Sequence, residues 1–446
     1  MSDGSATRIR IDADLVIRGI GEPIPNGSVV IDGDMISYVG PSAGAPPGAG
    51  ERPPGQRAAG EATAGEGTAG DALDNTIGAA AIRVPVLMPG LWDAHAHFLG
   101  LNRPDLAAYA TTTAVQAAAR ATVDLRTVLE SGFTSVREVG GFGLRISPAI
   151  EDGSVPGPHV YGAGAVLSTT GGHADIHSLP VDWVGDPRFA GYDVFHLADG
   201  VPECLRAVRL QLRRGAKVIK ICASGGVMSE LDHPVHQQFS DTELVAIVEE
   251  AARADRVVAA HCHGKPGIMA ALRAGARTIE HGTFLDREAA DLMLERDAIL
   301  VPTRFVLEGL LAMRAQMPVY AYHKLAALAD RHAEATRLAI EAGVTIAGGS
   351  DWIVSGSAAE GQLSREALHL MDLGLPAAKA IQAMTANGPL TVGPQARRSG
   401  RLEVGSDADL IGLDRDPLTD RSAWADPQRV THVWKGGRIV KAPRAA

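Results

Sequence analysis

The chain has 446 residues, a formal net charge of −10 and 4% aromatic residues. A chain of this length buries a large core and has room for more than one structural unit. The acidic balance gives no basic footprint for nucleic acid or for an anionic membrane, so we expect neither as a partner. The polar N-terminus and the lack of a long apolar run predict a cytoplasmic protein.

Both ends of the chain contain short alternating strands. In residues 8–40 apolar residues alternate with polar ones between Gly and Asp turns, and a similar pattern returns near the C-terminus. Residues 41–78 consist mostly of Gly, Ala, Pro, Glu and Thr, a composition that buries too little apolar surface to offset the entropy of ordering. We therefore predict a small β-sandwich domain built from residues 1–87 and 400–446, with 41–78 as a low-complexity surface insertion.

Residues 88–399 alternate short apolar strands with segments of helical periodicity. One helix is predicted over 242–255, because Ser240 and Glu243 form a capping box that satisfies free N–H groups at its start. The predicted strands end near His97, Val139, Leu167, Cys222, His261, His281, Thr303 and Asp351. This alternation of strand and helix favours an α/β fold with a parallel (β/α)8 barrel, whose functional groups lie at the carboxyl ends of the strands.

His95 and His97 stand at the end of the apolar run 84–91. In an extended strand residues i and i+2 point to the same face, so both imidazoles project together. Two neutral imidazoles on one face make half of a transition-metal site. On its own, such a pair is more often a solvated loop pair or includes a core histidine than a metal site. The residues at the other strand ends change that interpretation.

The predicted strand that ends near Cys222 contains Lys220 between two isoleucines, and other predicted strands end at His261, His281 and Asp351. A charged lysine is costly in an apolar strand, and desolvation lowers its pKa and frees the amine. Such an amine can add carbon dioxide to form a carbamate, an anionic ligand able to bridge two metal ions. Each residue alone could be structural, as a core histidine, a helix N-cap or a snorkelling lysine. Together, at one end of one barrel, they predict a metal site.

Further motifs surround these residues, namely residues 89–97, 280–282, 349–351 and 405–410. With Lys220 and His261 they make the sequence, from about Ile9 to Val440, resemble the amidohydrolase superfamily of metal-dependent hydrolases. The stretches 168–173 and 219–227 resemble the branch related to imidazolonepropionase. That branch includes prolidase-like and carboxypeptidase-like enzymes and ochratoxin-cleaving amidases.

The resemblance implies a binuclear centre with two divalent ions, which we expect to be Zn²⁺. It implies that His95, His97 and Asp351 hold one ion, that His261 and His281 hold the other, and that carboxylated Lys220 bridges both. Two ions close together can share one hydroxide and lower its pKa towards neutrality. Asp351 would orient that hydroxide, accept its proton and pass it to the leaving amine.

Three residues are candidates for contact with the substrate. His173, after the third strand, could polarise the scissile carbonyl or stabilise the oxyanion, or it could be a plain loop histidine. His261 and His263 form a second His-x-His pair. We favour His261 as the ligand because it ends the apolar strand, which leaves His263 to meet a substrate carboxylate. Arg304 could bind an acidic substrate or be a solvated loop arginine.

The leading functional hypothesis is hydrolysis of the amide bond to a C-terminal amino acid, in a dipeptide, an N-acyl amino acid or an ochratoxin-like amide. The alternative is a cyclic amide hydrolase or a deaminase of the imidazolonepropionase type. Such enzymes usually use one metal and no bridging lysine, so Lys220 favours the first hypothesis. A non-catalytic relative would lack metal ligands that this chain retains. We expect a small-molecule substrate and a homo-oligomer.

Overall fold

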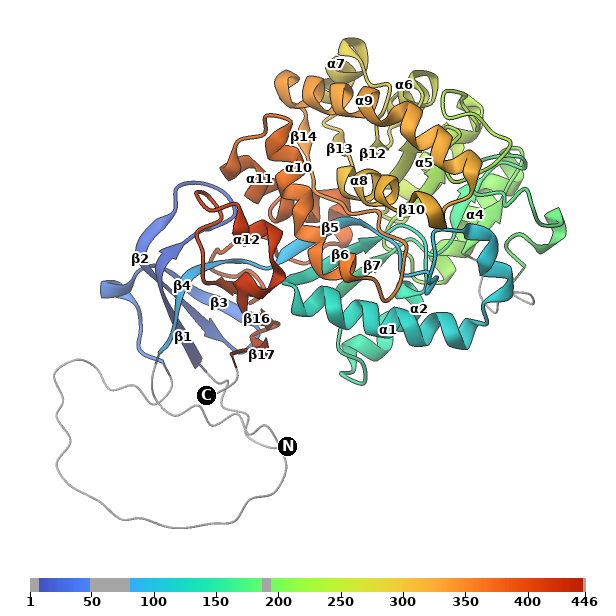
Figure 1. The fold of residues 1–446 in the computed structure, drawn as a ribbon. Helices are drawn as coiled ribbons and strands as arrows, with labels where there is room; N and C mark the ends of the chain where they lie inside the picture. Colours follow the sequence, from blue (N-terminus) through green and yellow to red (C-terminus); the bar gives the residue numbers. More distant parts are fainter. Residues whose placement is uncertain (1–7, 49–80, 187–193, 444–446) are drawn as a thin grey trace, which may run out of the picture.

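The computed structural model describes residues 8–48, 81–186 and 194–443. Figure 1 shows two units, a sheet made from both ends of the chain and, beside it, a group of shorter strands surrounded by helices. The predicted insertion 41–78 lies outside the described residues from position 49 onwards. In the described part of the chain, no helix combines the length and the apolar character needed to cross a membrane.

The terminal strands form one continuous seven-stranded sheet in the order β17-β16-β15-β4-β1-β2-β3. Strand β1 pairs antiparallel with β2 and parallel with β4, which joins the N-terminal strands to those from the C-terminus. The hydrophobic core of this sheet contains Ile11, Ile31, Val84, Leu410 and Trp434, which come from both ends of the chain. The strands are β1 (Arg8–Val16), β2 (Ile24–Asp32), β3 (Met35–Pro41), β4 (Ile82–Pro89), β15 (Leu410–Leu413), β16 (Val430–Lys435) and β17 (Arg438–Lys441).

Gly90 carries the chain from the terminal sheet into the second unit. It lies between β4 and β5 (Leu91–Ala96), and its N–H donates to the carbonyl of Asp409 at 2.9 Å. A Cβ atom at this position would lie 2.1 Å from Oγ1 of Thr134, so the close approach of the two units requires glycine. The boundaries 1–87 with 400–446, and 88–399, remain our proposal.

The second unit is a barrel of parallel strands. Its sheets have the orders β5-β6-β7 and β14-β13-β12-β11-β10-β8-β9. Backbone hydrogen bonds of 2.8 Å from Lys217 to Gly162 and from Ala94 to Gly348 join the sheets into a ring. The other strands are β6 (Phe133–Glu138), β7 (His159–Gly162), β8 (Val166–Ser168), β9 (Phe195–Leu197), β10 (Ile219–Cys222), β11 (Val258–Cys262), β12 (Thr278–His281), β13 (Ile299–Val301) and β14 (Thr345–Ile346).

The α/β fold class with a (β/α)8 barrel and a separate unit from both termini is therefore confirmed. The predicted third strand is divided into β7 and β8, and β9 is an additional strand that pairs with β8. Strands β10, β11 and β12 are buried along their whole length, as expected for parallel strands covered on both faces.

Helices alternate with the barrel strands and cover their outer side (Figure 1). The predicted capping box of Ser240 and Glu243 is present, but α5 ends at Ala252, three residues before the predicted end at Asp255. The helices are α1 (Ala114–Glu130), α2 (Gly143–Glu151), α4 (Val201–Arg213), α5 (Asp241–Ala252), α6 (Lys265–Ala274), α7 (Arg287–Glu295), α8 (Arg304–Ala312), α9 (Val319–Ala342), α10 (Glu366–Asp372), α11 (Ala377–Met384) and α12 (Ser422–Ala425).

Candidate metal centre

A cavity of about 960 Å³, part of it open to solvent, lies at the carboxyl ends of the barrel strands. One part of its wall is apolar and includes Leu99, Phe195, Val227, Met228 and Leu307. The polar side chains that line it are His95, His97, His173, Lys220, His261, His263, His281, Thr303, His332 and Asp351. The structure therefore brings together every predicted site residue except Arg304.

His95, His97 and Asp351 form the first group of candidate metal ligands, with ligand atoms within 4.8 Å of one another. The extended backbone of β5 directs both imidazoles to one face, as the spacing predicted. Oδ1 of Asp351 lies 3.3 Å from Nε2 of His95 and 3.2 Å from Nε2 of His97. Burial alone would raise the pKa of Asp351, but the two histidines lower it well below its ordinary value. Asp351 is therefore a carboxylate.

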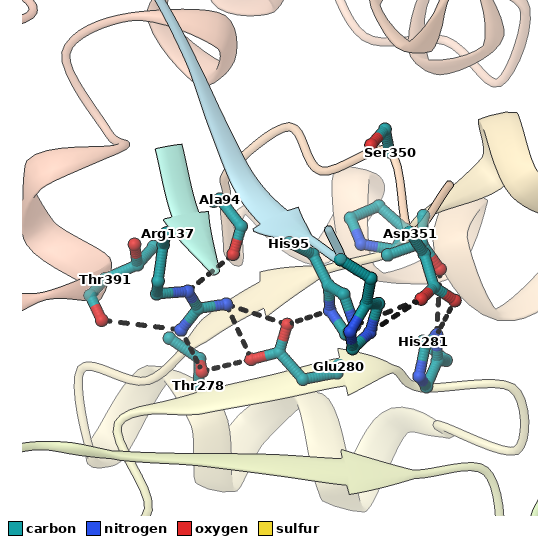
Figure 2. Close-up of polar contacts among 12 residues, drawn as sticks. Ala94, His95, Arg137, Thr278, Glu280, His281, Ser350, Asp351 and Thr391 are labelled. Atoms are coloured by element: carbon teal, nitrogen blue, oxygen red, sulfur yellow. Dashed lines mark hydrogen bonds and ion pairs between the residues drawn. The ribbon is translucent and has the colours of Figure 1, made fainter. Parts of the chain in front are cut away.

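The outer nitrogen of His95 is held by a buried ion pair (Figure 2). Nδ1 of His95 donates to Oε2 of Glu280 at 2.6 Å, and Arg137 donates to both oxygens of Glu280 at 2.8 Å. Burial on its own would raise the pKa of Glu280, but Arg137 and His95 lower it below its ordinary value. Because a carboxylate only accepts hydrogen bonds, it fixes the proton of His95 on Nδ1 and leaves a lone pair on Nε2.

His261, His263 and His281 form the second group, also with ligand atoms within 4.8 Å of one another. Nδ1 of His281 lies 2.8 Å from Oγ1 of Thr303, and Nδ1 of His263 lies 2.7 Å from Oγ1 of Thr283. Burial lowers the pKa of all three histidines, so they are neutral near pH 7. Both members of the His261 and His263 pair thus reach the same group.

The lysine predicted at the end of the fourth strand reaches the same cavity. Lys220 is only 3% exposed, and its amine has no hydrogen-bond or ion-pair partner among the described residues. Burial lowers the pKa of this amine, against the opposing effect of the Glu280 charge. A buried primary amine without a partner is costly as an ammonium ion, so the environment favours its neutral, nucleophilic form.

The ring of His173 lies against the second group. It stacks on His261 with ring centroids 4.2 Å apart and an interplanar angle of 19°. Its Nδ1 lies 2.8 Å from the hydroxyl oxygen of Ser229. Burial lowers the pKa of His173 to about 4, so the ring is neutral near pH 7 and can contact a substrate from the wall of the cavity.

Three non-glycine residues at the ends of barrel strands have left-handed backbone conformations. His281 has φ 67°, Thr303 has φ 58° and Asp351 has φ 53°. Such conformations cost of order 1–3 kcal/mol each and gather at functional sites. All three residues line the cavity, whereas the two other residues of this kind in the barrel, Asp255 and Asp297, precede β11 and β13.

Comparison with known proteins identifies the family. A sequence profile described as the Amidohydrolase family matches residues 86–440. The chain is also 43% identical over 445 residues to the ochratoxinase of Aspergillus niger, which covers 97% of this chain and 86% of that protein. The chain belongs to the amidohydrolase family. It is accordingly a hydrolase that acts on amide bonds of a small-molecule substrate.

Solved structures show the same amidohydrolase architecture. The crystal structure of A. niger ochratoxinase has a TM-score of 0.86 at 41% identity, covering 99% of this chain and 98% of that one. A prolidase complexed with N-methylphosphonate-L-proline has a TM-score of 0.83 at 33% identity, covering 98% of this chain and 100% of that one. A Xaa-Pro dipeptidase with bound methionine has a TM-score of 0.80 at 30% identity, with coverage of 98% and 100%.

The structure does not bring Arg304 to the amidohydrolase cavity. Its guanidinium pairs with Glu308 and donates to Nδ1 of His332 at 3.1 Å and to the carbonyl of Ala329 at 3.2 Å. Arg304 begins α8, which turns its side chain towards α9 rather than towards the cavity. His332, which the sequence reasoning missed, lines the cavity in its place.

The sequence reasoning also missed the residues that hold the histidines. Arg137 and Glu280 are charged residues within strands that are buried along their whole length. These strands also contain Thr or Ser, so the apolar run that singles out Lys220 is missing around them. Asp93 accepts from the backbone N–H of His95 and of Ser350, both at 3.0 Å. It thereby ties β5 to the segment that carries Asp351, a contact that no local pattern indicates.

Arg137→Met should destabilise the fold by about 3–5 kcal/mol at neutral pH, because it leaves the Glu280 carboxylate buried without its partner. Loss of Arg137 lets burial raise the pKa of Glu280, so protonation relieves the penalty and the deficit should shrink as the pH falls. The measurement is chemical unfolding of parent and variant between pH 4 and 8.

The matched control is Arg209→Met, which removes the ion pair between Arg209 and Glu250. The Arg209 side chain is 60% exposed. It should lose much less stability, because solvent screens the pair. Equal losses for the two variants, or a deficit for Arg137→Met that does not change with pH, would contradict this role for Arg137.

Proposed function

We propose that this protein is a binuclear metal-dependent amidohydrolase that cleaves the amide bond to a C-terminal amino acid. The observation that carries the proposal is the pair of ligand groups, His95, His97 and Asp351 on one side and three histidines on the other. Four or more imidazoles with one carboxylate favour zinc among the divalent ions.

The histidine tautomers fit a metal at each group. His97 donates Nδ1–H to the carbonyl of Gly140 at 2.7 Å, as His95 does to Glu280. His261 donates Nε2–H to the carbonyl of Gly225 at 3.2 Å. Since these partners only accept, each ring keeps one lone pair for a metal. This fixed tautomer supports His261, rather than His263, as the ligand of the second ion together with His281.

Lys220, as a carbamate, would supply the ligand shared by both ions. The absence of a partner for its amine among the described residues supports this assignment, because a carbamate turns a costly buried cation into an anionic ligand. When bound, two divalent ions polarise a carbonyl oxygen and lower the pKa of water towards neutrality. Asp351 then accepts the proton of the attacking water and delivers it to the leaving amine.

The cavity supports an N-acyl amino acid or dipeptide with a large apolar group as the substrate. Its apolar wall suits an aromatic or aliphatic acyl group or side chain. Lys220 is the only Lys or Arg that lines it within the described residues, so a product-side carboxylate would meet an imidazole, for which His263 is the candidate. The identity of 43% with an ochratoxinase supports ochratoxin-like amides within this class.

The parent enzyme, prepared with zinc and bicarbonate, should hold two divalent ions per chain by elemental analysis. Lys220→Ala should hold fewer and lose activity by at least about tenfold, because the shared ligand is gone. Lys217→Ala, at a lysine that precedes β10 and does not line the cavity, is the matched control. One ion or none in the parent, or two ions with normal turnover in Lys220→Ala, would argue against the bridging carbamate.

His263→Ala should raise KM for a free-acid substrate by about 10- to 100-fold, the loss expected for a hydrogen bond to a charged group. The matching C-terminal amide should be hydrolysed almost as before, and the metal content should stay intact. His261→Ala should instead lose a metal ion. Loss of metal in His263→Ala would reverse the assignment of the pair, and equal turnover of acid and amide by the parent would favour the cyclic-amide alternative.

A further inference from the structure

A chain of hydrogen bonds leads from His173 away from the cavity. Nδ1 of His173 lies 2.8 Å from the hydroxyl oxygen of Ser229, and that hydroxyl donates to Oδ1 of Asp232. The other oxygen of Asp232 accepts from the backbone N–H of Gly226 at 2.8 Å and from Nε2 of Gln238 at 3.3 Å. The loop after β10 is thus organised around one carboxylate.

Lys324 on α9 secures this carboxylate. Its ammonium group donates to the carbonyl oxygens of Gly226, Ser229 and Asp232 at 3.3, 2.8 and 2.6 Å, and lies 3.3 Å from Oδ1 of Asp232. The Asp232 side chain is 5% exposed. Burial would raise the pKa of Asp232, but its polar contacts lower it. Asp232 is therefore an ionised group that can only accept hydrogen bonds.

The network fixes the proton of His173. A serine hydroxyl has one hydrogen, and that of Ser229 goes to Asp232, so Ser229 must accept from His173. The ring therefore carries its hydrogen on Nδ1, and Nε2 keeps a lone pair. Nε2 has no hydrogen-bond partner among the described residues, and the ring lines the cavity.

The ring is also fixed in position. One of its faces stacks on His261. A Cβ atom on Gly226 would lie 2.1 Å from the imidazole of His173, so glycine lets the loop backbone close against the ring. The backbone N–H of His173 donates to Oε1 of Gln238 at 3.1 Å. Because Nε2 of Gln238 donates to Asp232, the backbone of His173 is linked to the same carboxylate as its ring.

We propose that Asp232, acting through Ser229, is a positioning residue that keeps the proton of His173 on Nδ1, so that Nε2 accepts a hydrogen bond from the N–H of the scissile amide. This inference rests on the proposed function and deepens it. It makes secondary amides the preferred substrates over tertiary amides such as Xaa-Pro bonds, which have no N–H to donate. It also reverses the expected direction of the His173 contact, because the neutral ring has no Nε2 hydrogen to give to a carbonyl oxygen.

Asp232→Asn is the decisive variant. If the amide oxygen keeps the bonds from Gly226 and Gln238, the amide nitrogen faces Ser229 and donates to it. Ser229 then donates to Nδ1 of His173, and the hydrogen of the ring moves to Nε2. The variant preserves shape and should reverse the tautomer, while Lys324 keeps its bonds to the three carbonyl oxygens when the amide nitrogen replaces Oδ1. Ser229→Ala removes the hydroxyl that links His173 to Asp232, and Ser229→Thr retains a hydroxyl there. Comparing the two variants distinguishes loss of the hydrogen-bond network from general damage to the loop.

The first measurement compares kcat/KM for an N-acyl amino acid and for its N-methyl analogue. The parent should prefer the N–H substrate by about tenfold or more. In Asp232→Asn and Ser229→Ala, kcat/KM for the N–H substrate should fall by about 10- to 100-fold, so that most of the preference is lost. Ser229→Thr should keep it. Asp175→Asn is the control, because that carboxylate accepts from Gly171 in the loop after β8 that carries His173, but not from Ser229.

A fall of equal size for both substrates in Asp232→Asn, or loss of preference in Asp175→Asn, would mean a merely structural role and overturn the proposal. Hydrolysis of neither amide by the parent would overturn the proposed function instead. The second measurement does not depend on turnover. Long-range ¹H–¹⁵N correlation of histidine-labelled holoenzyme, with His173 assigned by His173→Gln, should show Nδ1–H in the parent and Nε2–H in Asp232→Asn. Nε2–H in the parent would overturn the inference whatever the substrate.

Discussion

The buried pairing of Arg137 with Glu280 is the interaction on which the rest of the site depends. Both side chains are fully buried, and Arg137 also bonds to Oγ1 of Thr278 at 2.8 Å. A well-packed apolar pair would contribute as much stability or more, since two charges lose their hydration here. What the ion pair adds is orientation, because the Glu280 carboxylate can only accept a hydrogen bond and so fixes His95 with its Nε2 lone pair directed at the Asp351 side of the cavity.

The same principle recurs around the cavity. Backbone carbonyls fix His97 and His261, and a serine backed by a carboxylate fixes His173. The polar wall is built mainly from the carboxyl ends of the strands and the loops that follow them, with His332 from α9. The apolar wall comes largely from α8, α9 and the loops, as with Leu307, Leu325 and Met228. This division allows the residues that surround the substrate to change without moving the groups that perform the chemistry.

The barrel and the cavity residues on its strands could be predicted, because each depends on local sequence. A buried strand has a continuous apolar run, and a polar residue at its end is conspicuous, as with His95, Lys220 and Asp351. Pairings across the barrel could not be predicted in this way. Arg137 and Glu280 are 143 positions apart, and His173 and Ser229 are 56 apart. Arg304 fails for a related reason, since the direction of its side chain depends on how α8 packs against α9.

The central claim, that the two groups of strand-end residues hold two metal ions, is tested most directly by anomalous diffraction at the zinc edge from crystals of zinc-loaded enzyme grown with bicarbonate. We expect two peaks roughly 3.5–4 Å apart, one bonded to His95, His97 and Asp351 and the other to His261 and His281, with density for a carbamate on Lys220 between them. A single peak, or two peaks bonded to other residues, would contradict it.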